Sequence, residues 1–514
     1  MNHWIIAPVV LPAILAPLIA FVMRHDITLA RVASFAGTLG LGGIAVGLTM
    51  LAAGGETHVY ELGDWPAPFG IVLVLDRLSA MMVLLTAALA LIVLFHAVAT
   101  GWDSRGRHFH ALFQFQLMGI CGAFLTGDAF NLFVFFEVLL IASYGLMIHG
   151  GGRVRLQAGL QYVVMNLAGS TLFLFALGTL YAATGTLNIA DLAVKVREIP
   201  LEEAALVRVA AMLLMIVFAI KAALFPVQFW LPATYANAPA PVAALFAIMT
   251  KVGAYAILRI HTVVFGPDAA AIGGLPGTWL FPAAVVTLGL GVIGVLGARR
   301  LMPLVAFSVV GSMGTLMLAI SVFTPYAVTA ALYYLVHSTF AAAALFLLAD
   351  LVVSRRAGGD VLTVRPPTVQ NGLFATLFFA GALGMVGMPP LSGFIGKLFV
   401  LDALRDAPGM ALGWTVILVG SLLSIVGFAR AGSVLFWKST AATPDPEVET
   451  AALPKTPAAG PAEVAPTMAA VAALALLSAF AGPVTDYLES TAGQLFERTG
   501  YISAVLGQNM EGEP

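Results

Sequence analysis

Five ionisable side chains interrupt long apolar stretches of the sequence, and all five are of types that carry protons. Glu137, Lys221, Lys251 and Lys397 each stand among apolar neighbours, and His337 lies in the segment LVHSTFAAAALF. A charged side chain at the centre of a bilayer costs about 2.5–3.5 kcal/mol, so such a group usually faces water or an opposite charge. A carboxyl, three amines and an imidazole can each bind and release a proton. We therefore interpret these residues as candidates for a proton or cation pathway.

Glu137 and Lys221 are the candidates for a pair of opposite charges, because each lies near the middle of its apolar segment. Burial favours the neutral form of both groups, and pairing favours the charged form of both, so each depends strongly on the other. Such a pair can act as a switch; the alternative is a static ion pair that fixes helix packing. The further groups Lys251, His337 and Lys397 favour a relay over a static pair.

The composition indicates an integral membrane protein. Of the 514 residues, 60% are hydrophobic and 10% are charged, whereas soluble domains carry about 25% charged residues. The net charge of −2 argues against a nucleic-acid partner, since no surplus of Lys and Arg is available to neutralise phosphates. Cys121 is the only cysteine, which excludes an internal disulfide or a four-thiolate metal centre within this chain. The sequence predicts no cofactor and no metal site.

Apolar stretches of about 20 residues, long enough to cross a bilayer, recur about fourteen times. Their approximate bounds are 4–23, 29–52, 71–99, 109–126, 129–149, 158–184, 207–231, 240–263, 278–298, 302–323, 326–350, 373–404, 411–437 and 466–484. The first stretch lacks a basic n-region and a cleavage site, so we expect a spanning helix rather than a signal peptide. Residues 438–466, rich in Pro, Ala, Thr and acidic side chains, predict an exposed loop. The polar tail after Pro483 is expected to lie along the surface.

Alternate loops differ in their positive charge. One set carries thirteen Lys and Arg residues, which are Arg24, Arg31, Arg105, Arg107, Arg153, Arg155, Arg299, Arg300, Arg355, Arg356, Arg365, Lys438 and Lys455. The other set carries five, which are Lys195, Arg197, Arg208, Arg405 and Arg498. By the positive-inside rule the first set is cytoplasmic, which places both termini on the outer side. Arg77, Arg259 and Arg430 lie near the ends of apolar stretches and are expected to reach the headgroups.

Prolines interrupt two of the stretches beside a lysine. Pro226 follows Lys221 within FAIKAALFPVQFWLP, and Pro389 and Pro390 precede Lys397 within GMVGMPPLSGFIGKLFV. The second stretch, at 1.5 Å per residue, would be about 48 Å long unbroken, well beyond a hydrocarbon core of about 30 Å. Proline frees backbone groups that survive at membrane depth only beside protein or water. Two breaks of this kind suggest internal repeats with one broken helix each.

The segment GLGVIG, residues 289–294, matches a dinucleotide-binding pattern in its letters alone. It lies inside a spanning stretch with no preceding strand, so we interpret its glycines as sites of close helix packing.

A longer segment resembles a known family. KAALFPVQFWLPATYANAPAPVAALFAIMTKVGAYAILR, residues 221–259, resembles the core signature shared by the antiporter-like subunits of respiratory complex I and the Mrp-type (Pha-type) multisubunit cation/proton antiporters. The resemblance is strongest to the D-type subunits of the Mrp antiporters and extends over nearly the whole chain. It implies fourteen helices with two inverted five-helix repeats, in which helices 7 and 12 are broken. The implied division is 1–108 for helices 1–3, 109–263 for the first repeat, 264–437 for the second repeat, 438–466 for a cytoplasmic loop, and 467–514 for helix 14 and the tail.

The resemblance also implies roles for single residues. Glu137 on helix 5, Lys221 on helix 7, Lys251 on helix 8 and Lys397 on helix 12 match the proton-pathway positions of the family. His337 would continue the pathway between the two halves.

Two positions depart from the complex I pattern. Gln228 stands where those relatives usually carry a histidine, and Ala341 stands after His337 where a lysine is often found. Glutamine does not titrate, so that step of a proton wire is absent. Both differences favour the Mrp branch.

The function implied by the resemblance is that of a proton-translocating subunit of a secondary Na⁺ or K⁺/H⁺ antiporter in the bacterial inner membrane. Such a subunit is a transporter component rather than an enzyme, needs no cofactor, and has the other Mrp subunits as partners. One alternative is a proton-pumping membrane subunit of a complex I-like or hydrogenase-type oxidoreductase, with the redox centres in partner chains. A second alternative is a structural scaffold, for which mid-membrane charges are an expensive choice. The sequence contains no set of oxygen ligands whose spacing separates Na⁺ from K⁺.

Overall fold

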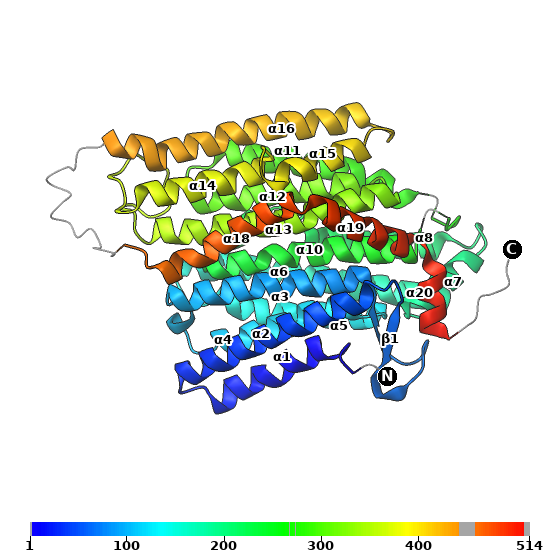
Figure 1. Cartoon of the computed structure of the whole chain (residues 1–514). Coiled ribbons are helices and arrows are strands. Elements are labelled where there is room, and N and C mark those ends of the chain that lie inside the picture. Colours follow the sequence, from blue (N-terminus) through cyan, green and yellow to red (C-terminus); the bar gives the residue numbers. More distant parts are fainter. Residues whose placement is uncertain (1–2, 267, 273, 442–457, 508–514) are drawn as a thin grey trace.

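The computed structural model describes residues 3–266, 268–272, 274–441 and 458–507, which form a bundle of long helices lying roughly side by side (Figure 1). Among these residues, 11 helices are long and apolar enough to cross a membrane, and three shorter apolar helices cover Ala7–Val22, Phe109–Leu125 and Asn371–Val386. Each of the apolar stretches predicted from the sequence overlaps one of these helices. The prediction of a helical, polytopic membrane protein is confirmed, with one short β-hairpin added.

The helices and strands have the following bounds. They are α1 Ala7–Pro17, α2 Ile27–Ala52, β1 His58–Glu61, β2 Val72–Leu75, α3 Arg77–Ala99, α4 Phe109–Leu125, α5 Ala129–Met147, α6 Arg153–Thr184, α7 Ile189–Glu198, α8 Ala205–Ala222, α9 Trp230–Asn237, α10 Ala240–Val263, α11 Leu275–Gly297, α12 Leu301–Ile320, α13 Pro325–Val353, α14 Asn371–Val386, α15 Ser392–Ala403, α16 Met410–Gly432, α18 Pro461–Ala479, α19 Ala481–Phe496 and α20 Arg498–Leu506.

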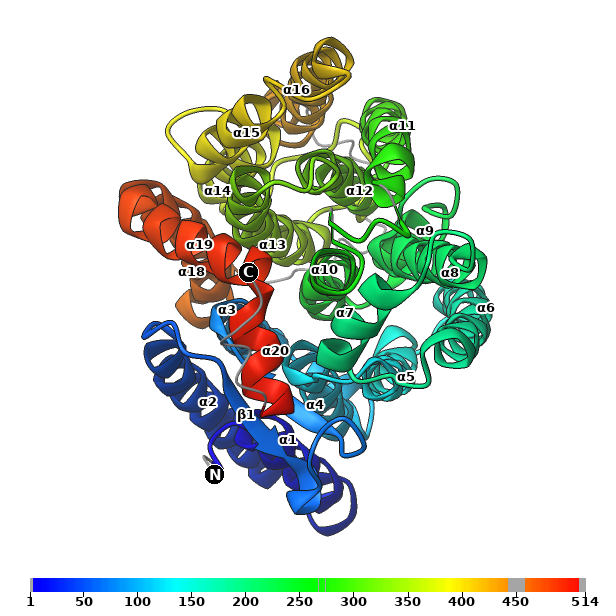
Figure 2. The same cartoon turned by 90° about the vertical axis from the view of Figure 1, so that its right-hand side faces the viewer.

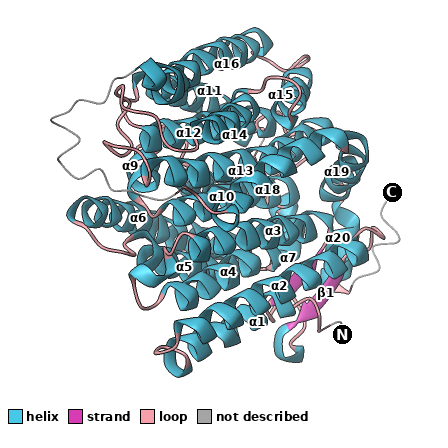
Figure 3. Cartoon of the chain, turned by 60° about the vertical axis from the view of Figure 1, so that its left-hand side comes forward, coloured by secondary structure: helices cyan, strands magenta, loops and turns pink. Residues whose placement is uncertain are grey.

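The two ends of the bundle differ, and we name each by what it contains. At the hairpin end, the right side of Figure 1, lie the antiparallel strands β1 and β2, the short helix α7 and the last helix α20. Figure 3 shows the hairpin between α2 and α3 in magenta at this end. The opposite end, the arginine end, carries the connections that include Arg105, Arg300 and Arg355. Helix α1 begins and α20 ends at the hairpin end, so the first and last described helices share that end.

Helix α10 is the buried centre of the bundle. Seen along the helices, it is surrounded by α3, α8, α12 and α13 (Figure 2), and every residue from Ala240 to Val263 is buried. A helix that is buried all round in this way can place a charge far from lipid, where neighbouring helices or water must stabilise it.

The two Pro-containing stretches are interrupted, as their sequences predict. Helix α8 ends at Ala222, and α9 begins at Trp230 after a turn that contains Pro226. Helix α14 ends at Val386, and α15 begins at Ser392 after a turn that contains Pro389 and Pro390. The first residue after each first half is left-handed: Ala223 has φ +53° and Gly387 has φ +81°. A left-handed residue ends a helix because it redirects the chain away from the next turn.

The start of the third predicted stretch is wrong. Residues 72–75 form strand β2, and the helix begins only at Arg77. Asp76 sets this start, because its carboxylate accepts a hydrogen bond from the Ser79 amide at 2.8 Å while the Ser79 hydroxyl accepts one from the Asp76 amide at 2.9 Å. This reciprocal pair is a capping box. The β-hairpin itself was absent from the prediction.

The prediction also placed the end of the loop before the last spanning stretch too late. Helix α18 begins at Pro461 rather than after Pro466. Proline suits the first position of a helix, and Glu463 accepts a hydrogen bond from the Gly460 amide at 2.7 Å and pairs with Arg355 at 2.7 Å. Of the predicted loop, residues 442–457 lie outside the described residues.

The polar tail does more than lie along the surface. Helix α19 packs against α3 and α13, and α20 then turns across the hairpin end (Figure 2). Leu488, Ala492, Leu495 and Tyr501 of this tail are buried.

Two of the three glycines in residues 289–294 pack helices together, as predicted, whereas a Cβ atom at Gly289 would meet nothing within 4 Å. A Cβ atom at Gly291 would lie 2.3 Å from the Gly311 amide nitrogen, and one at Gly294 would lie 2.1 Å from the Phe307 ring. Only glycine therefore permits this approach of α11 to α12.

Candidate functional site

Glu137 lies on α5 and faces α6. Its carboxylate accepts a short hydrogen bond from the Ser170 hydroxyl. Glu137 itself is only partly buried, whereas Phe136, Leu139 and Leu140 on the same helix are buried.

Lys221 occupies the last turn of α8, directly before the break. Its side chain is buried, and its amine donates a hydrogen bond to the Asn166 side-chain oxygen at 2.9 Å and lies 5.5 Å from the centre of the Phe136 ring. The carbonyl end of a helix carries partial negative charge. Because the break ends α8 inside the membrane, the partial negative charge of that helix end lies beside Lys221 and stabilises its positive charge.

The expected direct ion pair between Glu137 and Lys221 is not present. Within the described part of the chain, no carboxylate oxygen lies within 4.0 Å of the Lys221 amine. Instead each group is bound to α6, since Asn166 and Ser170 stand four residues apart on that helix and therefore on one face. The charge of Glu137 still acts on Lys221. The two charged groups are thus part of an arrangement of four side chains, in which each charged group is hydrogen-bonded to a neutral group on α6.

Lys251 lies in the middle of α10 and is fully buried. Its amine has no hydrogen-bond partner among the described residues. Burying an ammonium group without hydrogen-bond partners costs free energy. Lys251 therefore requires either a water molecule beside its amine or the neutral form of the amine.

His337 on α13 reaches into the second helix break. Its Nδ1 lies 2.9 Å from the hydroxyl of Ser392, the first residue of α15, and its Nε2 has no partner among the described residues. A Cβ atom at Gly393 would lie 2.9 Å from Nε2, so glycine makes room for the ring. Helix α13, which carries His337, packs against both α10, which carries Lys251, and α15, which carries Lys397.

Lys397 on α15 turns back toward the end of α14. Its amine donates hydrogen bonds to the Val386 carbonyl and to the Ser421 hydroxyl of α16, both at 2.8 Å. Beside it lies a small cavity of about 20 Å³, whose polar lining consists of Lys397, Tyr334 and the hydroxyls Ser308, Ser312, Thr315 and Ser424. A polar cavity of that size holds about one water molecule.

The structure also locates the two departures from the complex I pattern. Gln228 is in the turn between α8 and α9, and its side-chain oxygen is buried with no partner among the described residues. Ala341 is fully buried on α13, four residues after His337.

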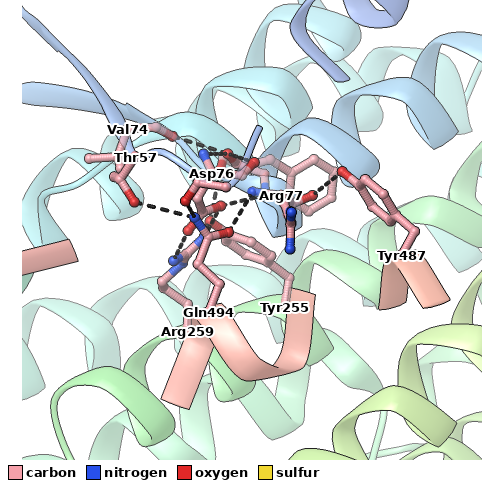
Figure 4. Close-up of polar contacts among 11 residues, drawn as sticks. Thr57, Val74, Asp76, Arg77, Tyr255, Arg259, Tyr487 and Gln494 are labelled. Atoms are coloured by element: carbon pink, nitrogen blue, oxygen red, sulfur yellow. Dashed lines mark hydrogen bonds and ion pairs between the residues drawn. The ribbon is translucent and has the colours of Figure 1, made fainter. Parts of the chain in front are cut away.

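Of Arg77, Arg259 and Arg430, only Arg259 contradicts the prediction from the sequence. Arg259 is 2% exposed and forms two hydrogen bonds to Asp76, at 2.5 and 2.8 Å (Figure 4). Arg77 donates to the carbonyl of Ala53 at the end of α2, and Arg430 donates to the carbonyl of Ala298 at the end of α11. The prediction that Arg259 reaches the headgroups is wrong, because a carboxylate 183 residues away in the chain meets it inside the protein.

Asp76 stands just outside the spanning part of α3. Burial acts to raise the pKa of Asp76, but attraction to Arg259 and the hydrogen bonds from Arg259 and Ser79 outweigh it, so the pKa lies below its usual value. The carboxylate is therefore held in its charged form beside the guanidinium.

Sequence analysis also missed the polar residues that contact the predicted groups. Asn166 and Ser170 could have been found as two polar residues spaced by four within the apolar segment 158–184. A second cluster joins α3 to α13 at the arginine end: Asp350 lies 2.9 Å from His96 and accepts a hydrogen bond from the Trp102 indole at 2.9 Å. Among the described residues, no group of three or more His, Cys, Asp or Glu side chains is arranged to hold a metal ion.

Known proteins resemble this chain over nearly its full length. The family model described as "NADH:quinone oxidoreductase/Mrp antiporter, TM" matches residues 126–425. The D-type subunit of a probable K⁺/H⁺ antiporter of Rhizobium meliloti (strain 1021) is 39% identical over 98% of each chain. The D-type subunit of the Na⁺/H⁺ antiporter of Bacillus subtilis (strain 168) is 36% identical over 98% of this chain and 100% of its own length.

A solved structure agrees with these matches. A chain in the structure of the Mrp complex from Dietzia sp. DQ12-45-1b superposes with a TM-score of 0.88 at 30% identity, over 99% of this chain and 100% of that chain. The matched part covers both helix breaks and all five pathway candidates, and the resemblance stated from residues 221–259 is confirmed. This chain belongs to the NADH:quinone oxidoreductase/Mrp antiporter family of transmembrane subunits.

Proposed function

We propose that this chain is the D-type subunit of a multisubunit secondary antiporter that exchanges a monovalent cation, Na⁺ or K⁺, for protons. The observation that carries the proposal is the set of protonatable side chains contributed by successive helices of the bundle. Lys221 on α8, Lys251 on α10 and His337 on α13 are buried, and Lys397 on α15 is half-buried beside a small polar cavity. The names of the relatives, which are subunits of K⁺/H⁺ and Na⁺/H⁺ antiporters, support it.

The orientation we propose follows from the charge of the loops. The arginine end faces the cytoplasm and the hairpin end faces the outside, because positively charged loops are retained inside. Both termini are then on the outer side of the bacterial cell membrane. The other subunits of the antiporter are the partners, and the apolar outer faces of α2, α6 and α16 meet lipid or those subunits.

The mechanism we propose begins at the four-residue arrangement on α5, α6 and α8. When Glu137 is protonated, Lys221 loses the attraction of a nearby negative charge and becomes a stronger proton donor. Rotation of the Asn166 or Ser170 side chain, or entry of a cation, changes the coupling between the two charges without moving a helix. The released proton continues through Lys251 and His337 to Lys397. One charge crossing 100 mV corresponds to about 2.3 kcal/mol, which is comparable to a shift of one to two pKa units.

Flux measurements on the assembled complex test this proposal. We expect Glu137→Gln and Lys221→Ala each to abolish cation-dependent proton flux in everted membrane vesicles, while the complex still assembles. Lys195→Ala is the matched control, because Lys195 forms only a partly exposed pair with Asp191 on α7 and is expected to leave flux unchanged. Full flux in either pathway variant would exclude the scheme.

The transported cation and the alternative function are resolved by two measurements. Dequenching assays of the intact complex with Na⁺, K⁺ and Li⁺ across pH identify the cation. The family model also names NADH:quinone oxidoreductases, so a proton-pumping subunit of a redox complex is the second candidate. An absorption spectrum of the purified complex with bound flavin or iron–sulfur centres would favour that candidate.

A further inference from the structure

A column of polar side chains follows one face of α10 from the membrane interior to the hairpin end. Lys251, Tyr255 and Arg259 are spaced by four residues, so their side chains lie above one another on that face. The eight residue-to-residue steps from Lys251 to Arg259 span about 12 Å at 1.5 Å per step. All three side chains are buried. The proposed step from Lys251 to His337 leads to α13 and uses neither Tyr255 nor Arg259.

Near the outer end of the column, Tyr255 and Arg259 are joined by a hydrogen bond. The Tyr255 hydroxyl accepts a hydrogen bond from Arg259 at 3.2 Å and donates one to the Phe124 carbonyl at 2.7 Å. Arg259 then makes its two bonds to Asp76 (Figure 4). At the inner end stands the Lys251 amine, which has no partner among the described residues.

The tail of the chain covers the outer end of this column. The Tyr501 ring of α20 lies 5.5 Å from the Arg259 guanidinium, and the Tyr501 hydroxyl is buried without a partner among the described residues. Helix α19 holds the residue next to Asp76: Gln494 accepts a hydrogen bond from the Arg77 amide at 3.0 Å, and the Tyr487 hydroxyl donates one to the Arg77 carbonyl at 3.0 Å.

An open pocket lies on the other side of this cover. It has a volume of about 630 Å³ and is lined by Glu56, Arg77, Gln494, Glu497 and Tyr501, among others. Water in this pocket reaches Tyr501 and Arg77, the two neighbours of the buried Arg259 and Asp76. The ion pair and the tyrosine therefore separate an aqueous pocket from the polar face of α10.

We propose that the polar face of α10 is a second, outward branch of the ion path from Lys251, and that the Asp76–Arg259 pair beneath Tyr501 is the gate that closes it. This inference rests on the proposed antiport function and adds Tyr255, Arg259, Asp76 and the C-terminal helices to its machinery. In the closed state a bidentate ion pair fills the column. Opening requires the guanidinium to leave the carboxylate, and α20 opposes that movement because Tyr501 packs against Arg259. A gate of this kind prevents protons from passing without cation exchange.

The passive proton leak of the purified complex in proteoliposomes tests the gate. The leak is measured with a pH-sensitive dye under an imposed proton gradient and without a cation gradient, so it reports on the gate even if the antiport assignment fails. We expect Tyr501→Ala to raise the leak about tenfold, which corresponds to a tenfold larger open population. Tyr501→Phe keeps the ring over Arg259 and is expected to retain the leak of the unmodified complex. Leak at the unmodified level in an assembled Tyr501→Ala complex would overturn the proposal.

A second pair of variants separates the gate from general loosening of the bundle. Asp76→Asn removes the charge and retains a good helix cap, and we expect it to raise the leak at least as much as Tyr501→Ala. Its control is Asp103→Asn, because Asp103 forms a comparable two-bond pair with Arg31, at 2.6 and 2.9 Å, away from α10. An equal leak in Asp76→Asn and Asp103→Asn would overturn the proposal. If Asp76→Asn does not assemble, the two Tyr501 variants decide the question alone.

Discussion

The two helix breaks share one backbone geometry but differ in the side chain that donates to the free carbonyls. In each, a first half-helix ends at a left-handed residue, and a side chain from the second half reaches back to its exposed carbonyls. At the first break this side chain is Trp230, whose indole donates to the Ile220 carbonyl at 3.0 Å. At the second break it is Lys397, whose amine donates to the Val386 carbonyl at 2.8 Å.

This difference determines what the two lysines can do. The Trp230 indole, a neutral group, donates to a carbonyl at the end of α8. The Lys221 amine is therefore free to donate to Asn166 near the charge of Glu137. Lys397 is at once a protonatable group and the cap of α14, and its further contact is a hydroxyl. We infer that the first break couples the lysine to an acid, whereas the second couples the protonation of its lysine to the geometry of the break.

Replacement of Lys397 gives the largest expected effect and tests this dual role. We expect Lys397→Gln to lower proton flux about 100-fold, because an amide cannot take part in proton transfer. Its side-chain NH₂ can still donate to the Val386 carbonyl, so thermal stability is expected to remain near that of the unmodified complex. Lys397→Ala is expected to lower flux equally and also to destabilise the complex by about 1–3 kcal/mol, since a buried carbonyl loses its donor.

Flux assays and thermal unfolding of the purified complex distinguish the two roles of Lys397. Equal stability of the Gln and Ala variants would show that the amine does not cap α14. Substantial flux in Lys397→Gln would remove Lys397 from the relay.

Gly387→Ala tests the geometry of the second break and has a smaller expected effect. Gly387 has φ +81°, and a Cβ atom there would lie 2.6 Å from the Lys397 side chain. We expect a loss of stability of about 1–2 kcal/mol from the left-handed conformation, together with reduced flux because Lys397 must move. Gly372→Ala on α14 is the control, since a Cβ there meets nothing within 4 Å. Normal flux in Gly387→Ala would mean that the position of Lys397 is less constrained than the structure indicates.

Composition and local spacing predict much of this molecule. The apolar stretches locate the helices because each must exceed the thickness of the hydrocarbon core. Pro226 and Pro389 locate the breaks because proline cannot continue the hydrogen bonding of a helix. Glu137 and Lys221 could be selected from their types alone, since charged groups inside a membrane are rare.

What the sequence could not predict are contacts between distant segments. Asp76 precedes a helix, where a capping role is expected, while Arg259 lies near the end of a helix, where a long side chain is expected to reach lipid headgroups. Their pairing depends on how α3 packs beside α10. In the same way, Asn166 and Ser170 bind Lys221 and Glu137 only because α6 packs against both α5 and α8. Strand β2 was merged with the following helix, since four apolar residues before Asp76 fit either structure.

Trp230→Phe addresses the first break and has the smallest expected effect. It removes the indole donor to the Ile220 carbonyl but keeps an aromatic ring in a buried site. We expect a loss of stability of about 1 kcal/mol, because the Ala223 amide still donates to that carbonyl at 3.2 Å. If the break depends on the indole to leave Lys221 available, flux should also fall by a few fold as the amine turns toward the vacant carbonyl. Trp437→Phe, at a residue that is 65% exposed, should change neither stability nor flux. If stability falls but flux is unaffected, Asn166 alone is sufficient to position Lys221. The difference between the two breaks would then depend on the acid Glu137 and not on the group that caps α8.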